Sequence, residues 1–294
     1  MSFIRAASAL LLLGLCSACV TNEEQGTPEG WSQITPDVVP EIAAMVPADI
    51  AARGTLTVGT NPPFAPFEFK NSAGNIIGLE LDLIHAAAAV MGLESQPVQQ
   101  DFSMILPAVT SGSLDAGASG FTDTDERRKN YDFVDFLYAG VQWAQQPGSN
   151  VDPDNACGLT VAVQRTTVSD TEDVRPKSEE CEAQGKAPIK VLAYDTSDTA
   201  ATALVLGRAD AFSADSPITA WAVERSGGKM ELTGEMFQAA PYGWPVPKDS
   251  ELGPALAAAL QHLIDTGDYA RILGQWNIHE GYLEHALINE EAIK

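Results

Sequence analysis

Two short stretches of the chain contain residue types that could hold a charged small molecule. The first runs from Asp115 to Arg127, where Ser119, Gly120 and Thr122 follow a short strand of small residues. The planar guanidinium of Arg127 suits a carboxylate. The second stretch comes much later and ends a short strand at Asp215, which could receive an ammonium group. Together they predict a pocket for the two charged ends of a free amino acid.

The pairing of these two stretches rests on charge. An amino-acid zwitterion carries two charges, and burying either one unpaired costs several kcal/mol, so a dry pocket needs both an arginine and a carboxylate. Taken alone, Arg127 with Arg128 and Lys129 would more often be a solvated basic face that balances nearby acids. The repeated organisation of the chain favours the pocket.

Each stretch belongs to a unit with the same outline. A helix is followed by a glycine, and three residues later an aspartate opens a short strand; the helices are expected over 103–110 and 198–206. Strands alternating with helices predict parallel α/β sheets, and two such units predict two similar lobes. In open α/β sheets ligands bind beyond the carboxyl ends of the strands, where both stretches fall.

Periodicity and turn residues predict the other elements. Strands are expected near 56–59, 67–69, 96–100, 141–144 and 159–163, and helices at 79–91, 254–265 and 268–276.

The N-terminus has the form of an export signal. Residues 1–18 contain Arg5, an apolar run too short for a permanent anchor, and small residues before Cys19. The Ser-Ala-Cys ending resembles the bacterial lipobox, although Cys16 replaces the usual leucine, so we expect a signal peptide at 1–18 and lipidation of Cys19. An ordinary cleaved signal is the alternative. The proline-rich segment 19–48 is expected to be a flexible tether.

Charge and cysteine usage exclude several partners. The formal net charge is −23, and such a surface repels nucleic acid, so we expect none to bind. Cys157 and Cys181 form an even pair in an oxidising compartment, which predicts a disulfide. The alternative, a metal pair, lacks histidines at ligand spacing. No metal or cofactor is therefore expected.

Short motifs in a fixed order carry a family resemblance. They are GTLTVG at 54–59, PFEF at 66–69, DFS at 101–103, LPA at 106–108, SG at 111–112, DA at 115–116, TDER at 124–127 and ADSP at 214–217. Over roughly 53–278 the chain resembles the extracellular amino-acid-binding proteins of bacterial ABC importers, with the closest likeness to glutamine- and glutamate-type binders.

The resemblance implies a type II periplasmic-binding-protein fold, in which two α/β lobes are joined by two hinge crossovers and clamp the ligand between them. On this basis lobe 1 comprises 49–139 and 242–282, lobe 2 comprises 140–241, and 283–294 form a polar C-terminal tail.

The same resemblance implies roles for individual residues. Gly120 matches the position whose backbone meets the ligand, Thr122 and Arg127 match the groups that hold the α-carboxylate, and Asp215 matches the ammonium receptor. Phe64 and Phe102 match two aromatic positions beside the ligand's carbon chain. The expected ligand-binding residues are Asn61, Phe64, Phe102, Ser119, Gly120, Thr122, Arg127, Gln164, Thr167 and Asp215.

The side-chain end of the ligand is expected near Asn61 and Gln164. Asn61 occupies a place where a carboxylate is common in the family, and we find no other acid for a cationic side chain. We therefore expect a polar neutral or acidic amino acid, such as glutamine or glutamate, rather than arginine, lysine or histidine. Thr166 and Val168 depart from the family pattern, so only backbone donors are expected to assist the carboxylate there.

These features predict a monomeric, lipid-anchored protein on the extracytoplasmic face of a bacterial membrane. It would bind a free L-amino acid by lobe closure and pass it to ABC permease subunits. A same-fold enzyme resembling cyclohexadienyl dehydratase is the first alternative, but it needs a general acid, and Asp215 is committed to the ammonium. We therefore expect no enzyme activity. An amino-acid sensor without transport is the second alternative.

Overall fold

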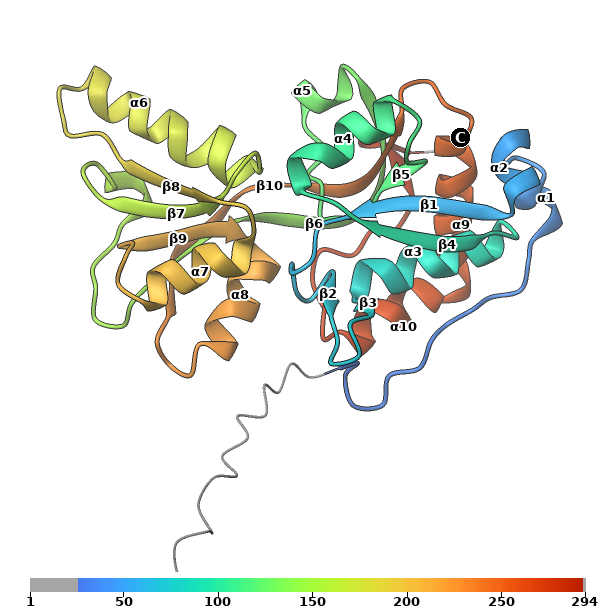
Figure 1. Cartoon of the computed structure of the whole chain (residues 1–294), viewed down its shortest axis with the longest axis horizontal. Helices are drawn as coiled ribbons and strands as arrows, with labels where there is room; N and C mark the ends of the chain where they lie inside the picture. The colour runs from blue at the N-terminus through green and yellow to red at the C-terminus, as the bar shows by residue number, and fades with distance from the viewer. Residues whose placement is uncertain (1–25, 293–294) are drawn as a thin grey trace, which may run out of the picture.

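Two α/β lobes are joined by two long strands in the computed structural model, which describes residues 26–292 (Figure 1). Lobe 1 has a three-stranded parallel sheet in the order β4–β1–β5, with bounds Glu94–Gln99, Thr55–Thr60 and Ala116–Gly117. Its other elements are α1 (Pro40–Ala43), α2 (Ala48–Arg53), the hairpin β2 (Phe69–Lys70) and β3 (Ile76–Ile77), α3 (Leu79–Val90), α4 (Phe102–Thr110), α5 (Asp125–Arg128), α9 (Leu252–Thr266) and α10 (Asp268–Gln275).

Lobe 2 repeats the arrangement around β7. Strand β7 (Thr160–Gln164) lies parallel to β8 (Lys190–Tyr194) and to β9 (Ala211–Asp215). Its helical segments are η1 (Pro153–Asn155), η2 (Ser169–Val174), α6 (Arg175–Ala183), α7 (Ser197–Val205) and α8 (Ser216–Arg225).

The aspartate repeated in the two lobes has a structural role. In lobe 1 the backbone N–H of Thr57 donates to Asp115 Oδ2 at 2.8 Å, and in lobe 2 the N–H of Thr160 donates to Asp210 Oδ2 at 2.7 Å. Each aspartate thus ties the start of its short strand to the neighbouring parallel strand. This shared hydrogen bond explains why the sequence repeats at these two places.

The hinge consists of β6 (Tyr131–Gln145) and β10 (Glu231–Pro247), which pair in antiparallel fashion along their whole length. The expected crossing points near 139 and 241 fall inside these two strands. On the lobe 2 side, β6 also pairs with β9, so that Val141 lies opposite Asp215. The hinge is therefore continuous with the strand that carries the expected ammonium receptor.

The N-terminal segment from Trp31 onward packs against lobe 1, which differs from the flexible tether expected for 19–48. The indole N–H groups of Trp31 and Trp276 both donate to Asp82 Oδ2 at 2.7 Å, while Ile34 and Val46 are buried. These apolar residues follow no helical or strand period, so the sequence did not indicate a packed segment. The expected signal peptide and Cys19 lie outside the described residues.

The C-terminal segment forms a small hairpin and is not the polar tail that we expected. Strands β11 (Leu287–Ile288) and β12 (Glu291–Ala292) pair with each other, and β11 extends the sheet at β6. Leu283 and Ala286 are buried, which anchors the segment. The pairing also places Glu290 beside the hinge strand, where its backbone N–H donates to Asp135.

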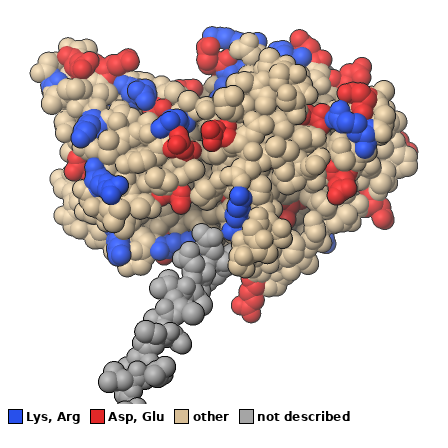
Figure 2. Space-filling model, viewed as in Figure 1, with Lys and Arg blue, Asp and Glu red and all other residues tan. Residues whose placement is uncertain are grey.

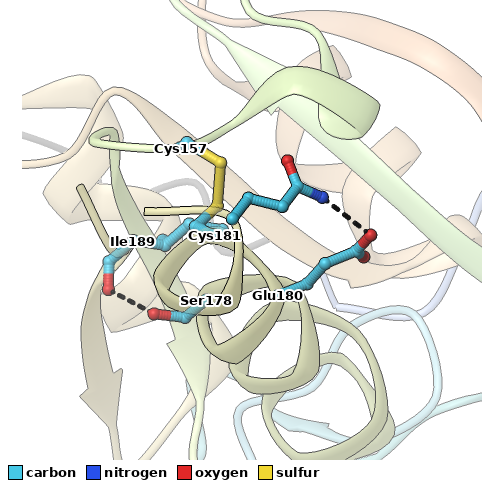
Figure 3. Close-up of a disulfide and its surroundings, with 6 residues drawn as sticks. Cys157, Ser178, Glu180, Cys181 and Ile189 are labelled. Atoms are coloured by element: carbon cyan, nitrogen blue, oxygen red, sulfur yellow. Dashed lines mark hydrogen bonds between the residues drawn. A yellow bond between two sulfur atoms is a disulfide. The ribbon is translucent and has the colours of Figure 1, made fainter. Parts of the chain in front are cut away.

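The predicted disulfide between Cys157 and Cys181 is confirmed, with Cα atoms 5.6 Å apart (Figure 3). It joins the loop before β7 to α6. Beside it, Ser178 Oγ donates to the carbonyl of Ile189 at 3.1 Å, which ties the same helix to the segment that leads into β8. Of the helices within 26–292, none is both long and apolar enough to cross a membrane.

Candidate functional site

Arg127 lies at the cleft between the lobes, in the last turn of α5. Thr124 caps this short helix by accepting the backbone N–H of Arg127 through its hydroxyl. The guanidinium Nη1 donates to the carbonyl of Thr122 at 2.7 Å, and Nη2 donates across the cleft to the carbonyl of Thr166 at 3.3 Å. Burial lowers its pKa, against the opposing charges of Glu172 and Asp215. Arg127 is therefore a partly buried cation that contacts both lobes.

Asp215 ends β9 on the lobe 2 side and is buried. Burial raises its pKa to about 6, while the Tyr242 hydroxyl and the charge of Arg127 oppose this rise. A carboxylate that is costly to desolvate is well suited to receive a cationic group, because pairing restores the interactions that burial removed. The structure thus brings Arg127 and Asp215 within electrostatic reach of each other.

The loop after β5 carries the small residues of the expected pocket. Ser119 Oγ accepts the backbone N–H of Asn61 at 3.1 Å, and Thr122 forms an isolated antiparallel bridge with Tyr242 on β10. Gly120 has a φ of +57°, a left-handed conformation that favours glycine. Its N–H donates to Glu80 Oε2 at 2.8 Å, so this donor is already used within the protein.

Asn61 and Gln164 meet across the cleft. Gln164 Nε2 donates to Asn61 Oδ1 at 2.8 Å, and Gln164 Oε1 accepts the Ser197 hydroxyl at 2.7 Å. Asn61 is in lobe 1 after β1, whereas Gln164 ends β7 in lobe 2. This bond and the bond from Arg127 to Thr166 both join the lobes, so the lobes are in contact across the cleft.

The remaining expected residues have different surroundings. Phe64 is buried. It lies beside Gly120, as shown by the distance of 2.5 Å between Phe64 Cε1 and a Cβ added to that glycine. Phe102 stacks on Phe121 with ring centroids 4.5 Å apart and belongs to a hydrophobic cluster with Ile105. The Thr167 hydroxyl donates to the carbonyl of Gln164 at 2.8 Å.

Several residues at the site escaped the sequence analysis. Tyr242 and Glu172 lie close to the two charged groups, and Glu68 and Glu80 lie behind the loop. No sequence pattern indicates Tyr242, since a tyrosine in a strand resembles a core residue. The PFEF motif includes Glu68, but its position within an apolar run did not indicate contact with a loop fifty residues away.

The surroundings of the cleft are acidic on the side of α5. A cavity of about 770 Å³ there is lined by residues of both lobes, including Asp125, Glu126 and Glu172. The face drawn in Figure 2 shows acidic and basic side chains scattered over both lobes, without a continuous basic surface. Within residues 26–292, histidine, cysteine and acidic side chains form no cluster of three that could bind a metal.

Comparison with known proteins places this arrangement among binding proteins. The chain is 65% identical over 279 residues to the arginine-binding protein ArgT of Corynebacterium glutamicum, which covers 94% of this chain and 92% of that protein. Its fold is similar to an ancestral arginine-binding protein bound to arginine, with a TM-score of 0.70 and 32% identity over 76% of this chain and 98% of that one. Holo ArgBP from T. maritima gives a TM-score of 0.66 at 29% identity, over 79% and 100% of the two chains.

These matches confirm the two-lobed fold and the prediction of an importer's binding protein rather than an enzyme. The model of the bacterial extracellular solute-binding proteins, family 3, matches residues 56–279, which include the cleft and both hinge strands. This chain belongs to that family.

Proposed function

We propose that this protein binds L-arginine between its lobes and delivers it to the membrane subunits of an ABC importer. The observation that carries this proposal is the 65% identity to an arginine-binding protein along 94% of the chain. The pairing of Arg127 with Asp215 supports recognition of the ligand's α-carboxylate and α-ammonium. The ligand is then basic, and the expectation of a neutral or acidic amino acid is corrected.

That expectation rested on the absence of an acid at position 61. This absence does not exclude a basic ligand. A guanidinium presents five N–H donors, and amide or carbonyl oxygens can also accept them, although each such bond is weaker than one to a carboxylate. The side-chain oxygens of Asn61 and Gln164 and the carbonyl of Asp195 cluster at one end of the cleft. They support a subsite in which the ligand's guanidinium replaces Gln164 Nε2 as the donor to Asn61 Oδ1 and to the Asp195 carbonyl.

The field around the cleft also supports a cationic ligand. The cavity at the α5 side is lined by five acids, Asp123, Asp125, Glu126, Glu172 and Glu290, against the two cations Arg128 and Lys129, and the formal net charge of the chain is −23. Such a field attracts a cation during diffusion to the site without contacting it in the bound state. These acids therefore speed the capture of a cation, while its binding in the pocket depends on the neutral oxygens named above.

The other proposals concern location and assembly. We infer that Cys19 carries a lipid that holds the mature protein on the extracytoplasmic face of the membrane, that residues 1–18 are a cleaved signal peptide, and that the protein acts as a monomer. Labelling cells with a fatty-acid analogue tests the anchor. A Cys19→Ala protein that still takes up the label would refute it.

The direct test of the ligand is calorimetric titration of the purified protein with each of the twenty amino acids. We expect the tightest binding for L-arginine, no turnover, and at least about a hundredfold weaker binding of glutamine, because glutamine forms fewer hydrogen bonds and lacks the charge. Absence of arginine binding would overturn the proposal. Tighter binding of glutamate than of arginine would overturn the charge argument as well.

The roles of the charged residues are tested by Arg127→Ala and Asp215→Ala. Each variant leaves one charge of the bound zwitterion unpaired, which costs roughly 3–5 kcal/mol and weakens binding about a hundredfold or more. Lys129→Ala, in the exposed position two residues after Arg127, is the matched control and should bind normally. Circular dichroism checks that the variants fold. Folded Arg127→Ala with unchanged affinity would contradict the assignment.

A further inference from the structure

The segment that carries Thr122 and Arg127 is tied together by a second arginine. Arg128, the last residue of α5, donates from Nε to Asp123 Oδ1 at 2.6 Å. Arg127, the residue before it, donates from Nη1 to the carbonyl of Thr122 at 2.7 Å. Two adjacent arginines thus bond to two adjacent residues, and the bond to a carboxylate is the one made by Arg128.

Asp123 is a buried carboxylate directly beside the expected ligand contacts. Its side chain has no exposed surface, and its backbone N–H donates to the carbonyl of Pro241 on β10 at 2.9 Å. Burial raises its pKa, while the hydrogen bond and the charge of Arg128 oppose the rise. Without a cation beside it, an ionised carboxylate here would repel an α-carboxylate held by Thr122 and would attract Arg127. The charge of Arg128 prevents both effects.

The C-terminal hairpin holds Arg128 from another direction. Arg128 Nη2 lies 3.0 Å from Glu290 Oε2. The Glu290 N–H donates to Asp135 Oδ2 at 2.9 Å, and β11 pairs with β6, so the hairpin is fixed to the hinge strand. Burial, followed by the charge of Asp123, raises the pKa of Asp135 to about 8. At neutral pH the Asp135 carboxyl is therefore mostly protonated and does not compete for the guanidinium of Arg128.

We propose that Arg128 is a positioning residue of the ligand site, which neutralises Asp123 and thereby keeps Arg127 available for the α-carboxylate of the ligand. The inference rests on the function proposed above, since it concerns the same pocket. The partners of the two arginines support this division of roles. Arg128 pairs with carboxylates, whereas the guanidinium of Arg127 donates to the neutral carbonyl oxygens of Thr122 and Thr166. A carboxylate is a stronger acceptor than a carbonyl and can replace them.

Substitutions at position 128 separate the charge from the contact. Arg128→Gln keeps an N–H donor for Asp123 but leaves the carboxylate without a cation, so we expect L-arginine to bind about tenfold more weakly. Arg128→Lys keeps the charge and should bind within about threefold of wild type. Lys129→Gln is the matched control, because it removes the same charge from the next residue, whose ion pair with Glu126 is exposed. Its affinity should equal that of wild type.

A second substitution decides between a role of the charge and a purely structural role of the ion pair. In Asp123→Asn/Arg128→Gln the uncompensated carboxylate is gone, so arginine affinity should return to within about threefold of wild type although the ion pair is lost. A purely structural role predicts that the double variant binds no more tightly than Arg128→Gln, and that result would overturn the inference. Circular dichroism checks that every variant is folded, and calorimetry at neutral pH measures the affinities.

The experiment also separates this inference from the proposed function. If wild type binds L-arginine and folded Arg128→Gln binds it equally well, the positioning role fails alone. If wild type instead binds another of the twenty amino acids, the arginine proposal fails, and the same variants are titrated with that amino acid. Every L-amino acid presents the same α-carboxylate to Arg127, so the loss in Arg128→Gln and the recovery in the double variant are expected with that ligand as well.

Discussion

At the scale of single residues, Gly120 shows how closely the site is built. Its φ of +57° is strained for any residue with a side chain, and a Cβ there would lie 2.5 Å from Phe64 Cε1 and 3.3 Å from Tyr242 Cε2. Its N–H is fixed by Glu80. A side chain at this position would therefore displace an aromatic wall and loosen the loop at the same time.

Gly120→Ala should weaken arginine binding by at least about tenfold, because Phe64 has to move into the cleft. Gly112→Ala is the matched control, since Gly112 has a φ of +73° and open space around its Cβ position. Both variants should lose about 1 kcal/mol of unfolding free energy from backbone strain. Calorimetry and urea denaturation measure the two effects, and equal loss of affinity in both variants would contradict the steric argument.

Some residues of the site could be identified from the sequence by their charge, whereas residues that resemble ordinary core could not. Arg127 and Asp215 stand out because each follows a short strand of small residues and the two together match the two charges of an amino-acid zwitterion. Tyr242 and Glu80 sit in segments that look like ordinary core, and their roles depend on contacts between distant elements. Ligand type was misjudged because the sequence shows which side chains are present but not which backbone carbonyls face the cleft.

At the scale of elements, the disulfide fixes a helix that otherwise has few apolar contacts. Of the residues of α6, Cys181 alone is buried, while Ser178 makes one bond to the chain before β8. The disulfide therefore attaches α6 to lobe 2, as a row of buried apolar side chains does in other helices.

Replacement of both Cys157 and Cys181 by alanine should lower the unfolding free energy by about 3 kcal/mol, the chain-entropy value for a loop of this size. Arginine affinity should change less than about threefold, since α6 lies away from Arg127 and Asp215. Urea denaturation with and without reductant measures the first effect on the wild-type protein as well. Equal stability of the double variant and wild type would refute a stabilising role.

Elements with a regular period were predicted closely, whereas those that depend on pairing were not. The helix expected at 79–91 is α3 (Leu79–Val90), and that at 254–265 lies within α9 (Leu252–Thr266). The sequence predicted only 141–144 of the fifteen-residue strand β6, because strand length here follows from pairing with β10. The packed N-terminal segment and the C-terminal hairpin likewise have no period of their own.

At the scale of the whole molecule, buried acids make stability depend on pH. Burial, followed by the charge of Asp123, raises the pKa of Asp135 on the hinge to about 8, and that of Glu80 is also about 8. In an unfolded chain such groups titrate near pH 4. Between these values the folded protein binds more protons than the unfolded chain, so the contribution of these two groups to stability is greatest below about pH 4 and falls as the pH rises toward 8.

The melting temperature should therefore fall by at least about 2 °C between pH 5 and pH 8, as expected for each kcal/mol lost in a chain of this size. Asp135→Asn removes one of the two titrations and should give a shallower slope. Differential scanning calorimetry over the pH series provides the measurement. A melting temperature that rises over this range would show that these carboxyls are ionised in the folded protein.

The insertion of lobe 2 as one uninterrupted segment has a practical consequence. Both described ends of the chain, Gly26 and Ala292, belong to the lobe 1 side, while the segment that forms lobe 2 starts and ends at Gln145 and Glu231, which pair side by side. Fluorescent labels at these two described positions would thus move together with lobe 1 and give no signal during capture. An optical sensor built from this protein needs one label in lobe 2, for example at the exposed turn that follows α6 near Lys186.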